Sequence, residues 1–223
     1  MPHRSFRLPR LRMNRVISEL APLFDGDVIN VSAWDDRDKE GRTYRDYFSK
    51  ASTYSTSNHE GERGVADAAD VSDYALDLTA ELPKELTGKF DVVFNHTTLE
   101  HIFDVTTAFH NLCLMTRDVV IVVVPFAQEM HYNESYGDFW RFTPMVMHRL
   151  FESNGLSVVF EAANDDSNAG LYVLTVGSRD PDKWRDRLPD SAPVEQLGKW
   201  IGATWRDRTR ATASKFAKTI GAK

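Results

Sequence analysis

The chain has 223 residues and a formal net charge of −6, with 27 Lys and Arg against 33 Asp and Glu. This length predicts one domain with appendages, and a hydrophobic content of 42% argues against global disorder. No apolar run is long enough to span a bilayer, the N-terminus lacks the apolar stretch of a secretory signal, and the single Cys113 argues against a disulfide framework. We therefore expect a reduced, cytoplasmic protein.

The net charge hides a segregation along the chain. Residues 1–15 carry a charge of +5 and residues 199–223 a charge of +6, whereas the interior carries −17. An acidic body with two basic ends is not a nucleic-acid-binding domain throughout. We expect three parts, which are a basic helical segment over 1–27, a globular domain over 28–180 and a basic amphipathic helical segment over 181–223.

In the first half of the chain, hydrophobic spacing and turn residues predict short elements separated by polar loops. The helices are expected over 11–24 and 41–50, the strands over 28–31, 52–57 and 74–78, and a polar loop over 58–73.

The second half has stronger signals. Strands are expected over 90–95 and 118–124, with a helix of about five turns between them from Leu99 to Cys113. The strand over 118–124 is dense in Val and Ile without alternation, which is typical of a strand covered on both faces. Thr143 and Pro144 predict the start of a helix over 144–153, and two late strands over 156–162 and 171–176 should pair antiparallel.

Strands that alternate with helices predict an α/β fold. We expect a Rossmann-like, doubly wound, mainly parallel sheet with an antiparallel edge strand, plus N- and C-terminal helices. In such sheets ligands bind beyond the carboxyl ends of the strands. The candidate site therefore lies at the strand ends over 30–34, 57–59, 77–78, 95–97 and 125–126.

The first of these strand ends lacks the glycines of a nucleotide-binding turn. Ser32 and Ala33 are small, so a ligand could still approach the backbone closely. Trp34 and the two carboxylates after it disfavour a pyrophosphate and suit a cationic or zwitterionic cofactor. An ordinary polar loop remains the alternative.

Two other strand ends have open interpretations. Asp77 could accept a hydrogen bond from a ligand amine, but capping of the next turn through Thr79 is favoured. A lone histidine such as His101 is more often structural than chemical. We predict no metal site, because the spacing of the candidate ligands is not diagnostic. Those candidates are His96, Glu100, His101 and His131.

The segment 125–144 is a long loop rich in His, acid, aromatic and Arg residues, and loops of this length tend to be functional. His131 has the pKa range of a general base, and Asp138 could orient it. Trp140 and Arg141 suit stacking and the recognition of an anion or hydroxyl. Alternatively, the aromatic residues close the end of the sheet and Arg141 pairs with Asp138.

Two motifs together resemble a known family. Segment 90–101 reads FDVVFNHTTLEH and closely resembles the LEH segment of class I S-adenosylmethionine-dependent methyltransferases. Segment 124–144, with VPF, His131 and DFWRFTP, resembles a signature of a subgroup often associated with glycan and sugar biosynthesis. The resemblance covers about 28–176. It implies that 28–180 is a methyltransferase-like domain with S-adenosylmethionine as cofactor.

The resemblance also implies roles for the strand ends. The first cofactor loop would consist of Asn30, Ser32 and Ala33, and the position that contacts the ribose of the cofactor would be Asn58. The adenine would be contacted by Asp77 and Leu78, and the methionine part by Asn95, His96 and Thr97. Two departures from the family matter. The glycines are replaced by Ser32 and Ala33, and the ribose acid by Asn58, for which Glu60 or Glu62 could substitute.

The implied reaction is methyl transfer to the hydroxyl of a sugar, glycan or other small molecule. It needs alignment of the acceptor and removal of its proton. His131 is the predicted base and Asp138 its orienter. The acceptor side of the site would be lined by Glu129, Tyr136, Trp140 and Arg141. Of these, Glu129 is the second choice for the base. The alternative is a catalytically reduced, methyltransferase-like binding protein, while nucleic acid is the least favoured substrate because no base-flipping motif is present.

The C-terminal stretch predicts a basic amphipathic helix. It could lie on an anionic membrane surface, in the groove of a partner, or on the acidic body of the protein itself. The Arg-rich N-terminus has the same alternatives. We therefore allow a peripheral membrane or partner contact in addition to the cytoplasmic location.

Overall fold

The structure, a computed structural model, describes residues 8–59, 72–132, 134, 136–164 and 171–191. The basic C-terminal segment from 192 onward, with its predicted amphipathic helix, lies outside the described residues, as do Glu60 and Glu62. Within the described part of the chain, no helix is long and apolar enough to cross a membrane.

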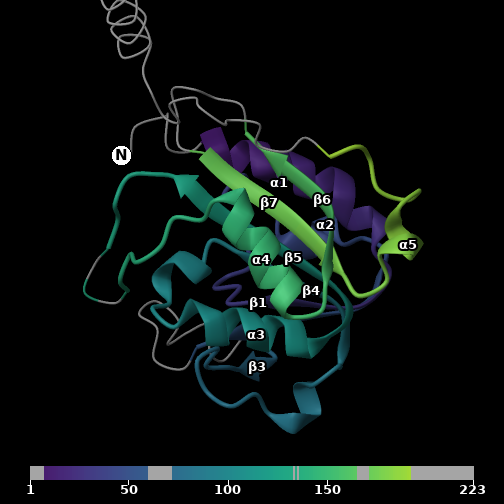
Figure 1. Ribbon diagram of the computed structural model, residues 1–223, viewed down its shortest axis with the longest axis horizontal. Helices are drawn as coiled ribbons and strands as arrows, with labels where there is room; N and C mark the ends of the chain where they lie inside the picture. Colours follow the sequence, from purple (N-terminus) through teal and green to yellow (C-terminus); the bar gives the residue numbers. More distant parts are fainter. Residues whose placement is uncertain (1–7, 60–71, 133, 135, 165–170, 192–223) are drawn as a thin grey trace, which may run out of the picture.

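One seven-stranded sheet, in the order β3-β2-β1-β4-β5-β7-β6, forms the centre of the described protein (Figure 1). Its strands are β1 (Gly26–Val31), β2 (Ala51–Asn58), β3 (Tyr74–Ala75), β4 (Phe90–His96), β5 (Thr116–Ala127), β6 (Ser157–Ala163) and β7 (Leu171–Ser178). The pairs from β3 to β5 are parallel, whereas β7 pairs antiparallel with both β5 and β6. The predicted Rossmann-like fold is confirmed, with β7 lying one strand in from the edge.

Helices cover both faces of this sheet. They are α1 (Leu8–Leu20), α2 (Tyr44–Tyr47), α3 (Val105–Met115), α4 (Pro144–Ser153) and α5 (Pro181–Trp184), with 3₁₀ turns η2 (Ala21–Leu23), η3 (Lys84–Leu86) and η4 (Leu99–His101). Buried residues of α3 and α4 share one hydrophobic cluster, and those of α1, α2 and α5 share the other. Figure 1 shows α4 in front of the sheet and α1 behind it.

Strand β5 divides its side chains between these two clusters. Its even-numbered residues from 120 to 124 pack with α3 and α4, and its odd-numbered residues from 119 to 123 pack on the face of α1. All of them are buried, which confirms the prediction of a strand covered on both faces. The strand continues past Pro125 because a shift of register between Pro125 and Ala127 accommodates the residue without an N–H.

The helix expected over 99–113 is two elements. The chain leaves the turn η4 through Ile102 in an extended conformation. It then starts α3 after Asp104, whose carboxylate accepts a hydrogen bond from the main-chain N–H of Thr107 at 3.3 Å. This N-cap separates the LEH motif from the helix.

The other boundaries differ by a few residues. The helix expected over 41–50 is reduced to the single turn α2, whose N-cap Thr43 and Asp46 form a capping box. The strand expected over 74–78 is reduced to the two residues of β3. Helix α1 begins earlier than expected and ends in η2, where Pro22 stands at the first turn.

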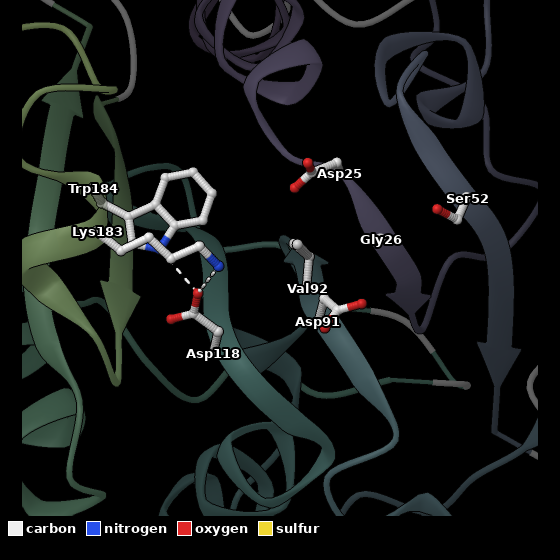
Figure 2. A pocket seen from close by; sticks show the side chains of 8 residues that line it. All are labelled: Asp25, Gly26, Ser52, Asp91, Val92, Asp118, Lys183 and Trp184. Carbon is white, nitrogen blue, oxygen red and sulfur yellow. Dashed lines mark hydrogen bonds and ion pairs between the residues drawn. The ribbon is translucent and has the colours of Figure 1, made fainter.

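At the amino ends of the parallel strands lies a hollow of about 350 Å³ (Figure 2). Figure 2 shows Lys183 and Trp184 of α5 directed at the carboxylate of Asp118, which accepts hydrogen bonds of 2.7 Å from Lys183 Nζ and 3.0 Å from Trp184 Nε1. Ser178 donates a third hydrogen bond to this carboxylate. Burial alone would raise the pKa of Asp118, but the three donors outweigh it and lower the pKa.

A second ion-pair group lies on the same edge. Arg117 donates to Asp27 at 2.9 Å and to both oxygens of Asp91 at 2.9 and 2.8 Å. Gly26 makes this arrangement possible, because its φ is +89° and a Cβ there would lie 2.2 Å from Asp91 Oδ2. Asp27, Asp91 and Asp118 at this edge are thus paired within the protein, which leaves the opposite edge as the candidate functional site.

Candidate functional site

The carboxyl ends of β1, β2 and β4 carry buried polar side chains, as the topology predicts. Asn30, Asn58, Asn95 and His96 are all at least nine-tenths buried at this edge. Buried polar groups are costly unless they are hydrogen-bonded. Their hydrogen-bond partners therefore show which of them hold the protein together and which are available.

The first loop is folded tightly against β2. Ala33 N–H donates to the carbonyl of Ser57 at 2.9 Å, and Asn58 joins the Trp34 main chain through both its amide oxygen (2.7 Å) and its amide nitrogen (3.0 Å). Ser32 and Trp34 have φ values of 57° and 55°. Such left-handed conformations are strained for residues other than glycine and are concentrated at functional sites.

Asp36 is a residue of this loop that our prediction did not single out. Its carboxylate accepts hydrogen bonds of 2.7 Å from Asn30 Nδ2 and from the Tyr54 hydroxyl. Asp38, two residues later, is fully buried and accepts a 2.6 Å hydrogen bond from the Tyr47 hydroxyl. The only sequence signal for these roles is the concentration of acids after Trp34.

Asp77 caps the turn that follows it. Its Oδ1 accepts hydrogen bonds of 2.7 Å from both the N–H and the hydroxyl of Thr79, and these bonds lower the pKa of Asp77. Its other oxygen lies 3.8 Å from His59 Nε2. The neighbouring Leu78 is buried, and its carbonyl accepts a hydrogen bond from Asn111. The capping interpretation therefore accounts for the Asp77 contacts that are present.

The end of β4 is less completely satisfied. Asn95 Nδ2 donates to the carbonyl of Val31 at 2.9 Å, while its Oδ1 has no partner. Burial lowers the pKa of His96 well below its ordinary value, so this imidazole is neutral, and its Nε2 also lacks a partner. Thr97, with φ 52°, accepts a 2.7 Å hydrogen bond from Arg10 of α1. Arg10 was missed at this site because it lies in the segment that we placed outside the domain.

Unpartnered polar atoms are concentrated at this edge. Six buried side-chain atoms of the described residues have no hydrogen-bond partner, and four of them lie at or just beyond the ends of β4 and β5. The four are Asn95 Oδ1, His96 Nε2, Glu100 Oε2 and Gln128 Oε1. Each such atom costs about 1–3 kcal/mol, and a ligand would recover that cost.

The two sequence motifs form a single unit. The carbonyl of Glu100 accepts hydrogen bonds from the N–H groups of Phe139 (2.8 Å) and Trp140 (3.3 Å), and Phe142 N–H donates to the carbonyl of Pro125 at 2.8 Å. The Trp140 indole donates to the carbonyl of Ile102 at 3.0 Å. The WRFTP segment is thereby fixed over the LEH turn η4.

Asp138 and Arg141 hold the loop that carries His131. The Asp138 carboxylate has no exposed surface and receives Arg141 Nη2 at 2.7 Å together with Arg141 Nη1. Hydrogen bonding by Arg141 is the main cause that lowers the pKa of Asp138 to about 2. Asp138 also accepts the His131 N–H at 2.7 Å, but the His131 imidazole is 3.7 Å away and Nδ1 is closer to the carbonyl of Glu129, at 3.1 Å.

The side chains of Glu100 and His101, from the turn η4, lie close to His131 of this loop. One potential ligand atom from each lies within 4.8 Å of the other two. The rings of His101 and His131 are 5.0 Å apart and nearly perpendicular. Burial raises the pKa of Glu100 to about 8 and lowers the pKa of His101. Of the four histidine and glutamate candidates in the sequence, His96 is the one outside this group.

The outer side of the cluster is aromatic. Tyr136 stacks edge-on against His101 with a centroid distance of 4.6 Å. Phe103 lies 5.5 Å from Phe139 and 6.3 Å from Trp140, and all three rings are exposed at the surface. Tyr136 therefore borders the imidazoles, and the other three rings form an exposed aromatic group.

Neither a family model nor a curated protein sequence matches the chain. Solved structures do match its fold. A putative methyltransferase in complex with the Trm112 activator of Haloferax volcanii is 13% identical, with a TM-score of 0.56, over 78% of this chain and 91% of that one.

A 1,6-didemethyltoxoflavin-N1-methyltransferase from Burkholderia thailandensis with bound S-adenosylhomocysteine is also 13% identical, with a TM-score of 0.52, over 74% and 76% of the two chains. A Rhodobacter sphaeroides protein described as a putative Zn-dependent alcohol dehydrogenase is 16% identical, with a TM-score of 0.54, over 75% and 89%. At these identities the likeness shows a shared fold, and one fold hosts many functions.

Proposed function

We propose that this chain is an S-adenosylmethionine-dependent methyltransferase that methylates a hydroxyl of a sugar, a glycan or another small molecule. The observation that carries the proposal is the group of unpartnered buried polar atoms at the carboxyl edge of the sheet. Ligands of doubly wound sheets bind at that edge. The fold shared with structures described as methyltransferases and the resemblance of the LEH and WRFTP motifs support the same reaction.

The residues at this edge fit the methionine end of the cofactor. Asn95 Oδ1 is a buried acceptor without a partner and would receive the α-ammonium group, and the Arg10 guanidinium at Thr97 would attract the α-carboxylate. The strained backbone at Ser32 and Trp34 gives the first loop a conformation that a bound cofactor would help to maintain.

At the acceptor side, His131 is the catalytic residue that we propose to activate the hydroxyl. Asp138 and Arg141 are positioning residues, because their hydrogen bonds fix the His131 main chain and the carbonyl of Glu129. The exposed rings of Tyr136 and Trp140 would align the acceptor and reduce its contact with water. S-adenosylmethionine supplies the methyl group when it is bound.

A second function is favoured by one specific observation. Asn58 stands at the ribose position, and both polar atoms of its amide already bond the main chain of Trp34. A carboxylate that accepts both ribose hydroxyls is therefore replaced by a neutral, engaged side chain. This favours a catalytically reduced, methyltransferase-like protein that binds a partner or a glycan precursor through the WRFTP loop.

Calorimetry and a transfer assay separate the two functions. Titration of the full chain with S-adenosylhomocysteine should give saturable binding, and labelled S-adenosylmethionine should methylate members of a panel of sugars and sugar nucleotides. Binding without transfer would favour the reduced protein. No heat at millimolar S-adenosylhomocysteine and S-adenosylmethionine would contradict the methyltransferase.

The variant His131→Ala should lose about 10²–10⁴-fold in transfer rate while keeping its affinity for S-adenosylhomocysteine. His110→Ala is the matched control, because His110 is an exposed histidine on α3 that bonds Asn154. Full transfer activity in His131→Ala would remove His131 from the mechanism.

A further inference from the structure

We propose that Glu100, His101 and His131 form a binding site for a divalent transition-metal ion of the zinc class. The spacing of these residues in the sequence did not predict such a site, but the fold brings one ligand atom of each within 4.8 Å of the others. The role of the ion in catalysis rests on the proposed function, whereas the binding of the ion does not.

The separations are close to those of an occupied site. Glu100 Oε1 and His101 Nε2 are 3.9 Å apart. Ligand atoms on a tetrahedral zinc ion are about 3.4 Å apart, as follows from bond lengths of about 2.0–2.1 Å. Shifts of about 1 Å or less in side chains would therefore complete the site.

The hydrogen bonds of both imidazoles leave Nε2 available to a metal ion. His101 Nδ1 donates to the carbonyl of Gly137 at 2.6 Å, and His131 Nδ1 donates to the carbonyl of Glu129 at 3.1 Å. These bonds place the ring proton on Nδ1 and leave Nε2 with a free lone pair. Metal-bound histidines commonly donate their second nitrogen to a carbonyl or carboxylate in this way.

Glu100 provides an independent observation. Its side chain is 1% exposed, and Oε2 has no hydrogen-bond partner. The other oxygen, Oε1, is the one that lies 3.9 Å from His101 Nε2. A cation bound by Oε1 would balance the charge of a buried carboxylate whose second oxygen has no partner. The peptide of Glu100 is itself held by two hydrogen bonds from the WRFTP segment, so the carboxylate starts from a fixed position.

The donor set indicates the class of ion. Two imidazoles and one carboxylate are typical ligands of zinc and related transition metals, while Mg²⁺ and Ca²⁺ prefer sites built of oxygen atoms. Three protein ligands leave a fourth position open. The ring of Tyr136 lies against His101 and is an aromatic neighbour of the cluster.

The ion would define how His131 activates the acceptor. A hydroxyl that binds at the open position has its pKa lowered by the ion, and it loses its proton to water. Because His131 Nε2 would then be a ligand, it would not accept that proton itself. The exposed ring of Tyr136 beside His101 would hold the body of the acceptor.

Ion binding can be measured without any methyl donor. The untagged full chain is stripped with a chelator and titrated with Zn²⁺ by calorimetry, and with Co²⁺ while its visible absorption is recorded. We expect one ion per chain and a cobalt spectrum of low coordination number. Loss of a direct ligand in His131→Ala should weaken binding by more than about 100-fold, because even the loss of an outer hydrogen-bond partner costs 10–100-fold. Glu100→Gln should have a similar effect, and His110→Ala should bind like the unchanged protein.

The outcomes are decisive in both directions. No binding at millimolar ion, or binding that Glu100→Gln and His131→Ala leave unchanged, would overturn the site. His131 is on a surface loop and its side chain is one-third exposed, so His131→Ala is expected to fold and tests the site independently of Glu100→Gln. The same samples are titrated with S-adenosylhomocysteine. Ion binding without S-adenosylhomocysteine binding would contradict the proposed function alone, and the reverse would contradict the metal site alone.

Discussion

The two edges of the sheet differ in how their polar groups are used. At the amino edge, Asp118 and the Arg117 ion pairs are satisfied by neighbours within the protein. At the carboxyl edge, Asn95, His96 and Glu100 are more deeply buried than the Arg117 ion pairs, and each has an atom without a partner. Both edges consist of the same strands, so the difference does not come from the fold. It indicates that one edge stabilises the protein while the other is kept available for ligands.

The hollow in Figure 2 illustrates this point, because a cavity alone would have suggested the wrong edge. Two of its carboxylates, those of Asp91 and Asp118, are ion-paired and their pKa values are lowered, as expected for structural contacts. At Glu100, burial outweighs the charges of Arg10 and Arg141 and raises the pKa instead. Asp91 and Asp118 thus have donors that offset their burial, whereas Glu100 at the opposite edge does not.

The largest expected effect is on stability at the amino edge. Trp184 is 2% exposed, packs 4.8 Å from Phe24 and bonds Asp118, so Trp184→Ala should lower the free energy of unfolding by about 3–5 kcal/mol. The matched change Trp34→Ala at the carboxyl edge, where the side chain is 56% exposed, should cost less than about 0.5 kcal/mol. Urea unfolding of both variants measures the contrast, and equal losses would contradict it.

A change from acid to amide at each edge is the next test. Asp118→Asn removes the charge that Lys183 and Trp184 contact, and should cost about 2 kcal/mol in the free energy of unfolding. Glu100→Gln keeps the shape of a side chain whose Oε2 has no partner to lose, and should change stability by less than about 0.5 kcal/mol. Thermal and urea unfolding check both values. A larger loss in Glu100→Gln than in Asp118→Asn would refute the division between the edges.

The smallest effect should depend on pH. Hydrogen bonds from Thr53 and Arg117 lower the pKa of Asp27 below 3.8, and those from Arg117 lower the pKa of Asp91. Lowered carboxylate pKa values stabilise the protein above about pH 4, and this stabilisation is lost as the pH falls through the folded-state values. Arg117→Met should therefore cost about 1 kcal/mol near neutral pH, a modest figure because the groups are partly exposed, and the cost should shrink at pH 3.

Urea unfolding at the two pH values measures this change. Arg149→Met is the control, since the side chains of Arg149 and Glu152 are 76% and 70% exposed and their pair should contribute little at either pH. A cost of Arg117→Met that stays constant from neutral pH to pH 3 would show that the pairing with Asp27 and Asp91 is not its source.

Much of the fold could be predicted from local patterns. The valine-rich run in β5 indicated burial on both faces, and Thr143 with Pro144 indicated the start of α4. Asp104 was not recognised as an N-cap, so one long helix was expected where η4 and α3 are separate. The strained Ser32 was not predictable either, because residues other than glycine rarely adopt such a backbone without tertiary support.

The candidate site was only partly accessible to such reasoning. The predicted alternative that Arg141 pairs with Asp138 involves neighbours in sequence, and the structure contains this pair. The proximity of His131 to Glu100 depends on hydrogen bonds that fold the 125–144 loop back over η4, and no spacing rule encodes that contact. Long-range contacts made by an irregular loop are where sequence patterns carry the least information.

The buried thiol of Cys113 can be used to measure local unfolding of the protein around α3. This thiol is the single one in the chain, it lies in α3 with 1% of its surface exposed, and burial raises its pKa to about 12. Alkylating reagents need an accessible thiolate, so they react only with molecules in which α3 has separated from the sheet. The alkylation rate therefore measures how often α3 separates from the sheet. Because α3 follows directly after the LEH turn, the same rate would show how strongly a ligand at the strand ends holds the two layers together.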